Sequence, residues 1–195
     1  VAGLVDDLSV SEDSYHNDDE SARTVAHARE AAQTVGIPLG TITISQPEDA
    51  NIAAAVGQLP EGESAVMYRG RAAEQLVERA EHYPWQQFDR CPYEELQDPG
   101  RVHVDPLGHL HICQGISLGN LYEQPLAEIW QQFEPFDHPI TGPLLDGGPA
   151  ELARRYGLAP AGDYADACHL CDTARRALRP QFPAILTPDQ MYGVP

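Results

Sequence analysis

Over the first part of the chain, the pattern of apolar and polar positions alternates between that of a strand and that of a helix. Short β-branched runs predict strands at Leu4–Val10, Gly40–Gln46 and Glu63–Gly70. Between the first two, a helix is predicted over Asp19–Val35, because acidic residues open it, Ala and Arg fill it, and Gly36 follows its last residue. Strands that alternate with helices are typical of βαβ units and a parallel sheet.

Two further helices continue this rhythm. Residues 47–59 predict a short helix, and Arg71–His82 predict another after the third strand. The functional loops of a parallel sheet lie at the carboxyl ends of its strands. In this chain those ends read SVSEDSYH, TISQPED and MYRGRA.

The pattern changes after residue 85, where proline and aromatic residues become frequent and indicate the start of a second domain. We therefore expect one domain over residues 1–85 and another over residues 86–195. A hairpin is predicted from RVHVD through the turn PLG to HLHIC, with Gly108 permitting the turn. We expect the following elements after it: a loop at Gly119–Asn120, an amphipathic helix from about Pro125, a helix within residues 141–157 after the Gly-Gly pair, a helix through DTARRALR, and an extended tail after Pro183.

Composition narrows the function classes. The formal net charge of the 195 residues is -18, and every basic side chain is arginine. Such a surface repels phosphate backbones and anionic membranes, so we expect neither nucleic acid nor a membrane as partner. The sequence contains no apolar stretch long enough for a bilayer and no signal peptide at its acidic start, so we expect a cytoplasmic protein. A chain of this length can bury a core without the help of a metal.

Four cysteines carry most of the chemical information: Cys91, Cys113, Cys168 and Cys171. The last two form a CxxC at the start of a predicted helix, where backbone amides favour thiolate charge. Four thiolates suit zinc or an iron–sulfur cluster. A redox CxxC is a third reading, but the sequence predicts no strand before this CxxC, and that reading gives Cys91 and Cys113 no role.

Several histidines lie close to these cysteines. His103, His109 and His111 belong to the predicted hairpin, where His109 and His111 share one face. They could bind a metal, but histidines on strands are more often solvated or hydrogen-bonded, and we favour that reading. His169 lies inside the CxxC, and we expect its side chain to point away from the sulfurs.

The order of these motifs resembles the auxiliary-cluster region of radical SAM enzymes, in the shortened form of the SPASM domain called Twitch. The resemblance covers residues 91–176: Cys91, then Gly108 and Cys113 with four residues between them, then SLGNLYEQPLAEIW, then the CxxC. It implies that Cys91, Cys113, Cys168 and Cys171 bind an auxiliary 4Fe-4S cluster beside an active site.

The first ninety residues are similar to the same family. SVSEDSYH resembles the fourth-strand segment of the radical SAM partial barrel, and MYRGRA resembles a later strand end. The resemblance implies that Ser11, Asp13 and His16 face the barrel mouth near S-adenosylmethionine or substrate, and that Arg71 binds an anion or carboxylate. Two simpler readings stay open: Asp13 caps the loop before a helix, and Arg71 is a surface helix residue. The implied fold class is α/β, the C-terminal part of a partial (β/α) barrel followed by a small α+β cluster domain.

One departure from the family is important. The CxxxCxxC loop that binds the catalytic cluster is absent from this sequence. The resemblance therefore implies a C-terminal portion of an enzyme, inactive alone, whose partner is the N-terminal half or a separate radical SAM core. The substrate of the complete enzyme would be a peptide or a small molecule. The alternative from another class is a non-catalytic binding module with a structural four-cysteine zinc site.

Overall fold

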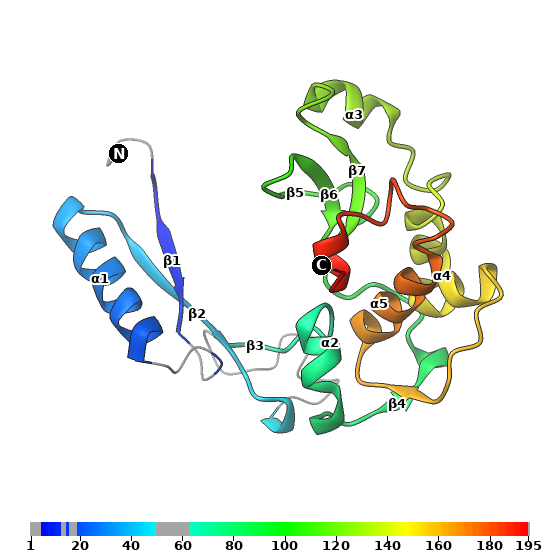
Figure 1. Cartoon of the computed structure of the whole chain (residues 1–195), viewed down its shortest axis with the longest axis horizontal. Helices are drawn as coiled ribbons and strands as arrows, with labels where there is room; N and C mark the ends of the chain where they lie inside the picture. The colour runs from blue at the N-terminus through cyan, green and yellow to red at the C-terminus, as the bar shows by residue number, and fades with distance from the viewer. Residues whose placement is uncertain (1–4, 13–14, 16–18, 50–62, 195) are drawn as a thin grey trace. The chain divides into compact units, whose positions relative to one another are not determined.

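The computed structural model describes residues 5–12, 15, 19–49 and 63–194 (Figure 1). The chain divides into two compact units, Val1–Val66 and Met67–Pro195. Within the described residues no helix combines the length and the apolar character that crossing a membrane requires.

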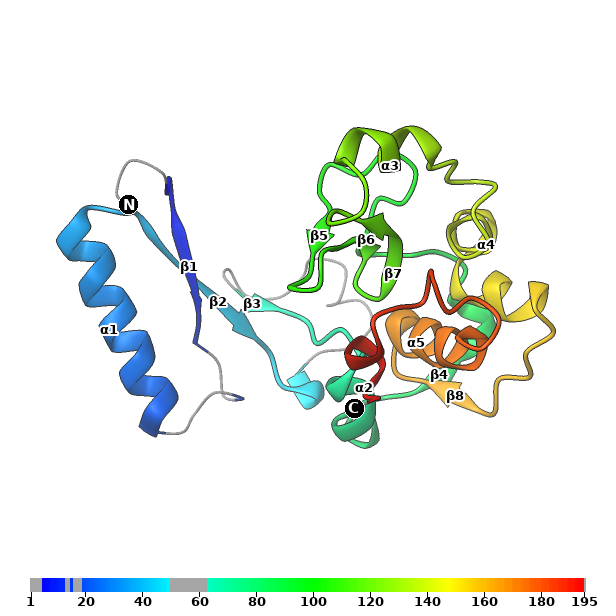
Figure 2. The same cartoon turned by 45° about the horizontal axis from the view of Figure 1, so that its top comes forward.

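The first unit contains a parallel sheet and one long helix. Its elements are β1 (Leu8–Ser11), α1 (Asp19–Val35), β2 (Leu39–Ile44), a 3₁₀ turn η2 (Pro47–Asp49) and β3 (Glu63–Ser64). The strand order is β1-β2-β3, and both pairings are parallel. Helix α1 runs along β1 and β2 (Figure 2). The predicted helix over Asp19–Val35 and the predicted parallel pairing of the first strands are both confirmed.

Helix α1 ends where the sequence predicts. Gly36 has a φ of 72°, a left-handed conformation that glycine adopts without steric cost. The amide of Ile37 donates to the carbonyl of Ala32 at 2.9 Å, and the amide of Gly36 donates to that of Gln33 at 3.3 Å. These two bonds form a Schellman motif, which satisfies the last carbonyls of the helix.

Other predicted elements of this half are shorter in the structure. The first strand starts at Leu8, since residues 5–7 are not part of the sheet, and the third strand covers only Glu63–Ser64 of the expected Glu63–Gly70. Most of the helix expected over residues 47–59 lies outside the described residues. In the second unit, α2 (Arg71–Gln75) stops at Gln75 and a 3₁₀ turn, η4 (Val77–Arg79), follows it.

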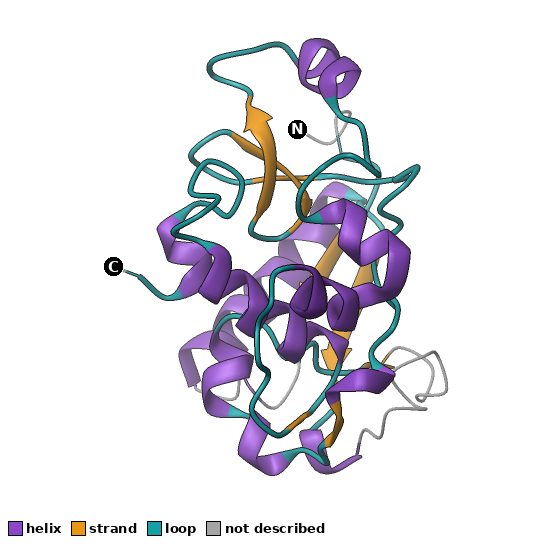
Figure 3. Cartoon of the chain, turned by 90° about the vertical axis from the view of Figure 1, so that its right-hand side faces the viewer, coloured by secondary structure: helices purple, strands orange, loops and turns teal. Residues whose placement is uncertain are grey.

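The second unit combines two small antiparallel sheets with helices (Figure 3). After α2 and η4 its elements are β4 (Tyr83–Pro84), η5 (Trp85–Gln87), β5 (His103–Val104), β6 (His109–Cys113), β7 (Ile116–Asn120), α3 (Leu126–Gln132), α4 (Thr141–Arg155), β8 (Asp163–Tyr164), α5 (Ala167–Leu178) and η6 (Asp189–Tyr192). One sheet has the order β5-β6-β7, and β4 pairs with β8.

The hairpin β5–β6 confirms the predicted turn, at which Gly108 has a φ of 86°. The loop expected at Gly119–Asn120 is wrong, because both residues end strand β7. Gly119 has a packing role in this strand: a Cβ there would lie 3.1 Å from Ile129 of α3. The glycine therefore makes room for a helix against the sheet.

Helix α4 contains the Gly-Gly pair that was expected to precede it. Gly147 and Gly148 have non-helical angles and divide the helix into two parts. Beyond the kink, the amide of Ala150 donates to the carbonyl of Phe88 at 3.0 Å. The kink thus attaches α4 to the segment that leads to Cys91. The helix α3, which begins just after Pro125, and the helix α5, which begins just before the CxxC, are confirmed.

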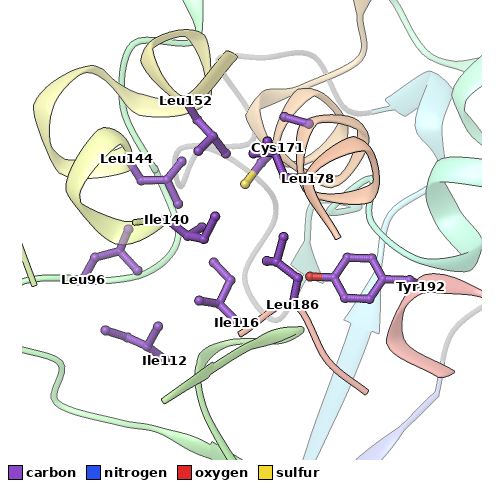
Figure 4. Close-up of a cluster of buried hydrophobic side chains, with 11 residues drawn as sticks. Leu96, Ile112, Ile116, Ile140, Leu144, Leu152, Cys171, Leu178, Leu186 and Tyr192 are labelled. Carbon is purple, nitrogen blue, oxygen red and sulfur yellow. The ribbon is translucent and has the colours of Figure 1, made fainter. Parts of the chain in front are cut away.

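The largest apolar core lies between α4, α5, the β6–β7 hairpin and the tail (Figure 4). Its members include Ile112, Ile116, Leu152 and Leu186, and in Figure 4 the sulfur of Cys171 points from α5 into this cluster. The tail was expected to be extended, but η6 places Tyr192 in the core, where its hydroxyl donates to the carbonyl of Gly115 at 2.5 Å.

Candidate metal centre

The four cysteines reach one cavity from three parts of the second unit. Cys91 comes from the irregular segment after η5, Cys113 from the end of β6, and Cys168 and Cys171 from the start of α5. All four line a cavity whose empty volume is about 430 Å³, including a part open to solvent. None of them forms a disulfide. Residues separated by up to 80 positions in the sequence therefore lie around one space.

The four cysteines line this cavity, but they do not converge on a single point that one metal ion could occupy. Within the described residues no three Cys, His, Asp or Glu side chains form a group tight enough to hold a metal ion. Zinc–sulfur bonds are about 2.3 Å long, so a single zinc ion would have to draw the sulfurs closer together. The donor set itself, four soft thiols, fits zinc or an iron–sulfur cluster.

Burial raises the pKa of three of these thiols. The pKa of Cys91 lies above its ordinary value, that of Cys168 well above it, and that of Cys171 at about 12. Removal from water is the largest cause in each case, and charge on Cys113 raises all three further. The pKa of each of these three thiols therefore depends on the charges around it, and a bound cation would favour the thiolate forms.

Two arginines supply positive charge at the same cavity. Arg69 donates from Nη1 to Sγ of Cys113 at 3.4 Å, and its charge lowers the pKa of Cys168. Arg175 is 2% exposed and lies one helical turn after Cys171. It donates to the carbonyl of Gln114 at 2.8 Å and lowers the pKa of Cys171. Buried cations of this kind favour a cluster that carries net negative charge.

Two aspartates of α5 hold the Arg69 segment against this helix. Asp166 is the N-cap of α5 and accepts from the amide of His169 at 2.7 Å, as capping residues commonly do. It also accepts from the amide of Tyr68 at 3.3 Å, and Asp172 accepts from the amide of Gly70 at 3.4 Å. The backbone on both sides of Arg69 is therefore bound to the helix that carries the CxxC.

Tyr93 contributes an unsatisfied polar group to the cavity. Its hydroxyl is buried and has no hydrogen-bond partner among the described residues, and Tyr93 is one of the residues that line the cavity. Burial raises the pKa of this phenol, and charge on Asp166, Cys168 and Cys91 raises it further. An unpaired buried donor costs about 1–3 kcal/mol. A group in the cavity that accepts a hydrogen bond from this hydroxyl would remove that cost.

The hairpin histidines do not line the cavity. His111 is fully buried, and its Nε2 lies 3.0 Å from Oδ2 of Asp105. Nδ1 of His109 lies 3.5 Å from Oγ of Ser117, and Nε2 of His103 lies 3.5 Å from Oε1 of Glu94. His109 and His111 therefore have polar partners on the hairpins β5–β6 and β6–β7, whereas His103 lies near Glu94, outside them, and its Nε2 forms no hydrogen bond within the described residues.

His169 also lies away from the sulfurs. Its Nδ1 accepts from the amide of Ala165 at 3.2 Å, and its ring packs edge-on against Tyr164 at 4.8 Å between centroids. It is not among the residues that line the cavity.

The four residues expected near S-adenosylmethionine fall in different places. Ser11 is exposed at the end of β1, where it lines a separate, open hollow between β1 and α1, with an empty volume of about 820 Å³ when open solvent is included. Asp13 and His16 lie outside the described residues. Arg71 is exposed and begins α2, in the other unit from Ser11.

Sequence reasoning missed three residues that line the cavity. Arg69 lies in the motif MYRGRA, two positions before the arginine that was singled out. Arg175 follows Cys171 by four positions, so the predicted helix could have placed it on the cysteine face. Tyr93 carries no comparable signal, because its segment has no regular secondary structure.

Comparison with known proteins adds no relative: no family model, no curated protein sequence and no solved structure matches this chain. A functional conclusion therefore depends on the motifs and on the geometry of the cavity.

Proposed function

We propose that this chain is the C-terminal portion of a radical SAM enzyme and binds an auxiliary 4Fe-4S cluster through Cys91, Cys113, Cys168 and Cys171. The observation that carries the proposal is that all four cysteines line one cavity. The choice of iron–sulfur over zinc rests on the order of the motifs in the sequence, since the donor set accommodates both.

The residues of the cavity have separate roles in this proposal. The four thiolates bind the cluster and leave no iron open to substrate, while Arg69 and Arg175 balance its charge. The apolar side chains around them, among them Leu96 and Ile116, exclude water. When bound, such a cluster supplies one-electron transfer.

The first unit supports the idea that further chain completes this protein. Parallel sheets are normally covered on both faces. In β2, however, Thr41 and Ile42 are exposed, with 46% of Ile42 accessible to solvent. In the proposed enzyme the N-terminal half or a separate radical SAM core supplies the CxxxCxxC cluster and S-adenosylmethionine. Ser11, Asp13, His16 and Arg71 would then face that cofactor or a peptide or small-molecule substrate, in the cytoplasm.

The test is the metal content of the chain after anaerobic purification and reconstitution with iron and sulfide. We expect brown protein with about four iron and four sulfide per chain, the composition of the proposed cluster. Cys171→Ser should lose most of this iron, because serine replaces one soft ligand. Ala174→Ser is the matched control, since Ala174 is buried in the same helix and the same core as Cys171.

Three results would contradict the proposal. Colourless protein with one zinc per chain would support the binding module with a structural zinc site. Turnover with a dithiol reductant and no metal would support a thiol redox protein. Equal iron and sulfide in Cys171→Ser and in Ala174→Ser would remove Cys171 from the set of ligands.

A further inference from the structure

Arg69 contacts a proposed cluster ligand through its side chain. Its Nη1 donates to Sγ of Cys113 at 3.4 Å, within the distance at which sulfur accepts a hydrogen bond. The side chain is 15% exposed, so it lies mostly inside the protein. A free arginine side chain samples many rotamers, and this entropy is lost when the guanidinium stays at one sulfur.

The structure restrains Arg69 through the backbone of the residues before and after it. The amides of Tyr68 and Gly70, on either side of Arg69, donate to Asp166 and Asp172 of α5. These aspartates flank the CxxC, so the backbone of Arg69 is fixed to the same helix as two of the ligands. The amide of Arg69 itself donates to the carbonyl of Met67 at 2.8 Å. The position of Arg69 relative to the cavity is therefore determined by the fold.

Glu94 forms a long ion pair with the guanidinium of Arg69. Its Oε1 lies 3.9 Å from Nη1 of Arg69, and its carboxylate is 5% exposed. The same carboxylate also pairs with Arg101 at 3.2 Å. Because Arg101 shares the charge of Glu94, this carboxylate cancels only part of the positive charge of Arg69.

We propose that Arg69 raises the reduction potential of the auxiliary cluster by donating a hydrogen bond to Cys113 and holding a positive charge beside the sulfurs. This inference rests on the proposed function. Reduction adds one electron from a low-potential one-electron carrier, with no bond formed or broken. The added negative charge is stabilised by a nearby cation, and hydrogen bonds to cluster sulfurs act in the same direction. Arg69 is thus a positioning residue, since it acts through Cys113.

Arg69 is a better subject for this test than Arg175. Arg175 donates to two backbone carbonyls, those of Cys171 and Gln114, and is 2% exposed. Its removal would leave buried acceptors unpaired and disturb the fold. The interactions of Arg69 with Cys113 and Glu94 involve side chains, so a substitution there changes the charge at the cavity with less effect on the backbone.

The experiment measures the midpoint potential of the reconstituted chain by a redox titration followed by electron paramagnetic resonance. Arg69→Leu should show a more negative midpoint than the wild type at the same iron and sulfide content. Arg69→Lys keeps the charge and should show a smaller shift. Arg90→Leu is the matched control, because Arg90 is exposed and its removal changes the net charge by the same amount without touching the cavity.

The outcomes separate this inference from the proposed function. A wild-type chain without iron and sulfide overturns both. A loaded Arg69→Leu protein with the wild-type midpoint, or with a shift equal to that of Arg90→Leu, overturns the role of Arg69 alone. If Arg69→Leu does not take up iron, Arg69→Gln gives the midpoint instead: a negative shift supports the inference and an unchanged value rejects it.

Discussion

Buried thiols and buried cations occur together at the cavity, and each affects the chemistry of the other. Burial keeps the pKa of Cys91, Cys168 and Cys171 above the ordinary value, so the metal-free thiols stay protonated at neutral pH. Arg69 and Arg175 act in the opposite direction on Cys168 and Cys171. At the proposed site, thiolates would be favoured only when a metal adds its own positive charge, so metal binding would release protons.

A histidine remote from the cavity gives a prediction for the pH dependence of stability. Burial lowers the pKa of His138 to about 4, and its Nδ1 accepts from the amides of Ile140 and Thr141 at 3.3 and 3.1 Å. Because this pKa lies below the ordinary value of 6.5, the unfolded chain binds the proton more readily than the folded one. The contribution is complete above pH 6.5 and is lost as the pH falls from about 6.5 to 4.

The measurement is the free energy of unfolding by urea at several pH values for the wild type and for His138→Asn. The asparagine oxygen can accept from the same amides without titrating in this range. We expect the difference between the two proteins to change by roughly 1–3 kcal/mol between pH 7 and pH 4, discounted for the partial exposure of the ring. A constant difference across that range would assign the acid sensitivity to other groups.

At the scale of elements, helix α5 organises the centre. It carries two of the four cysteines, Arg175, and the aspartates that hold the Arg69 segment. The kink in α4 fixes the segment before Cys91, since Ala150 binds the carbonyl of Phe88 beyond it. The β6–β7 hairpin supplies Cys113. Three elements therefore determine where the sulfurs lie, and each depends on a local backbone feature.

The kink in α4 leads to a prediction on stability. A Cβ on Gly148 would lie 2.2 Å from the backbone nitrogen of Arg90, and the φ of Gly148 is 63°. Gly148→Ala must therefore shift backbone as well as adopt a strained angle, and we expect it to lower the free energy of unfolding by more than about 2 kcal/mol.

The matched control for this variant is Gly157→Ala. Gly157 has nearly the same φ, 62°, but no atom lies within 4 Å of its added Cβ. Gly157→Ala should lower the free energy of unfolding only by the cost of the strained φ, about 1 kcal/mol. Equal losses in the two variants, measured by chemical denaturation, would show that the close approach to Arg90 has no energetic effect.

The sequence predicts best those elements whose signals are local. Helix α1, the β5–β6 turn at Gly108, and α5 each have a terminal signal within a few residues of the boundary. The strand at Gly119 and the kink at Gly148 were misread because each glycine makes room for a residue of another segment, Ile129 of α3 and Arg90 respectively. Glycine indicates a turn by default, and only tertiary packing shows that it makes room for another segment.

In the candidate site, too, the sequence shows the residues with a local signal and hides those placed by tertiary contacts. Four cysteines in a family-like order are visible in the sequence, and the structure brings them to one cavity. Arg69 was missed because its place depends on hydrogen bonds from its neighbours to Asp166 and Asp172, about a hundred residues away. No periodicity within the motif MYRGRA distinguishes Arg69 from Arg71.

At the scale of the whole molecule, every residue of the cavity belongs to the unit Met67–Pro195. The apolar core that contains Cys171 also lies within this unit. The first unit contributes the exposed parallel sheet, which we assign to the proposed enzyme core. In the proposed function, the cluster site would therefore belong to the second unit alone, separate from the first.

This separation predicts that a fragment of residues 67–195 binds the cluster alone. After reconstitution it should contain the same iron and sulfide per chain as the 195-residue protein, because it retains the four cysteines, Arg69 and Arg175. The same fragment with Cys171→Ser is the control. A fragment with native-like circular dichroism but little iron would show that the first unit is needed to form the site.

The bonds from Asp166 to Tyr68 and from Asp172 to Gly70 span 98 and 102 residues of sequence. Domains form from the N-terminus during synthesis, at about 5–20 residues per second. Arg69 therefore leaves the ribosome several seconds before the helix α5 whose aspartates bind its neighbours. The walls of the cavity therefore come together only after synthesis has reached α5, and until then the Arg69 segment lacks the two carboxylates that fix its backbone.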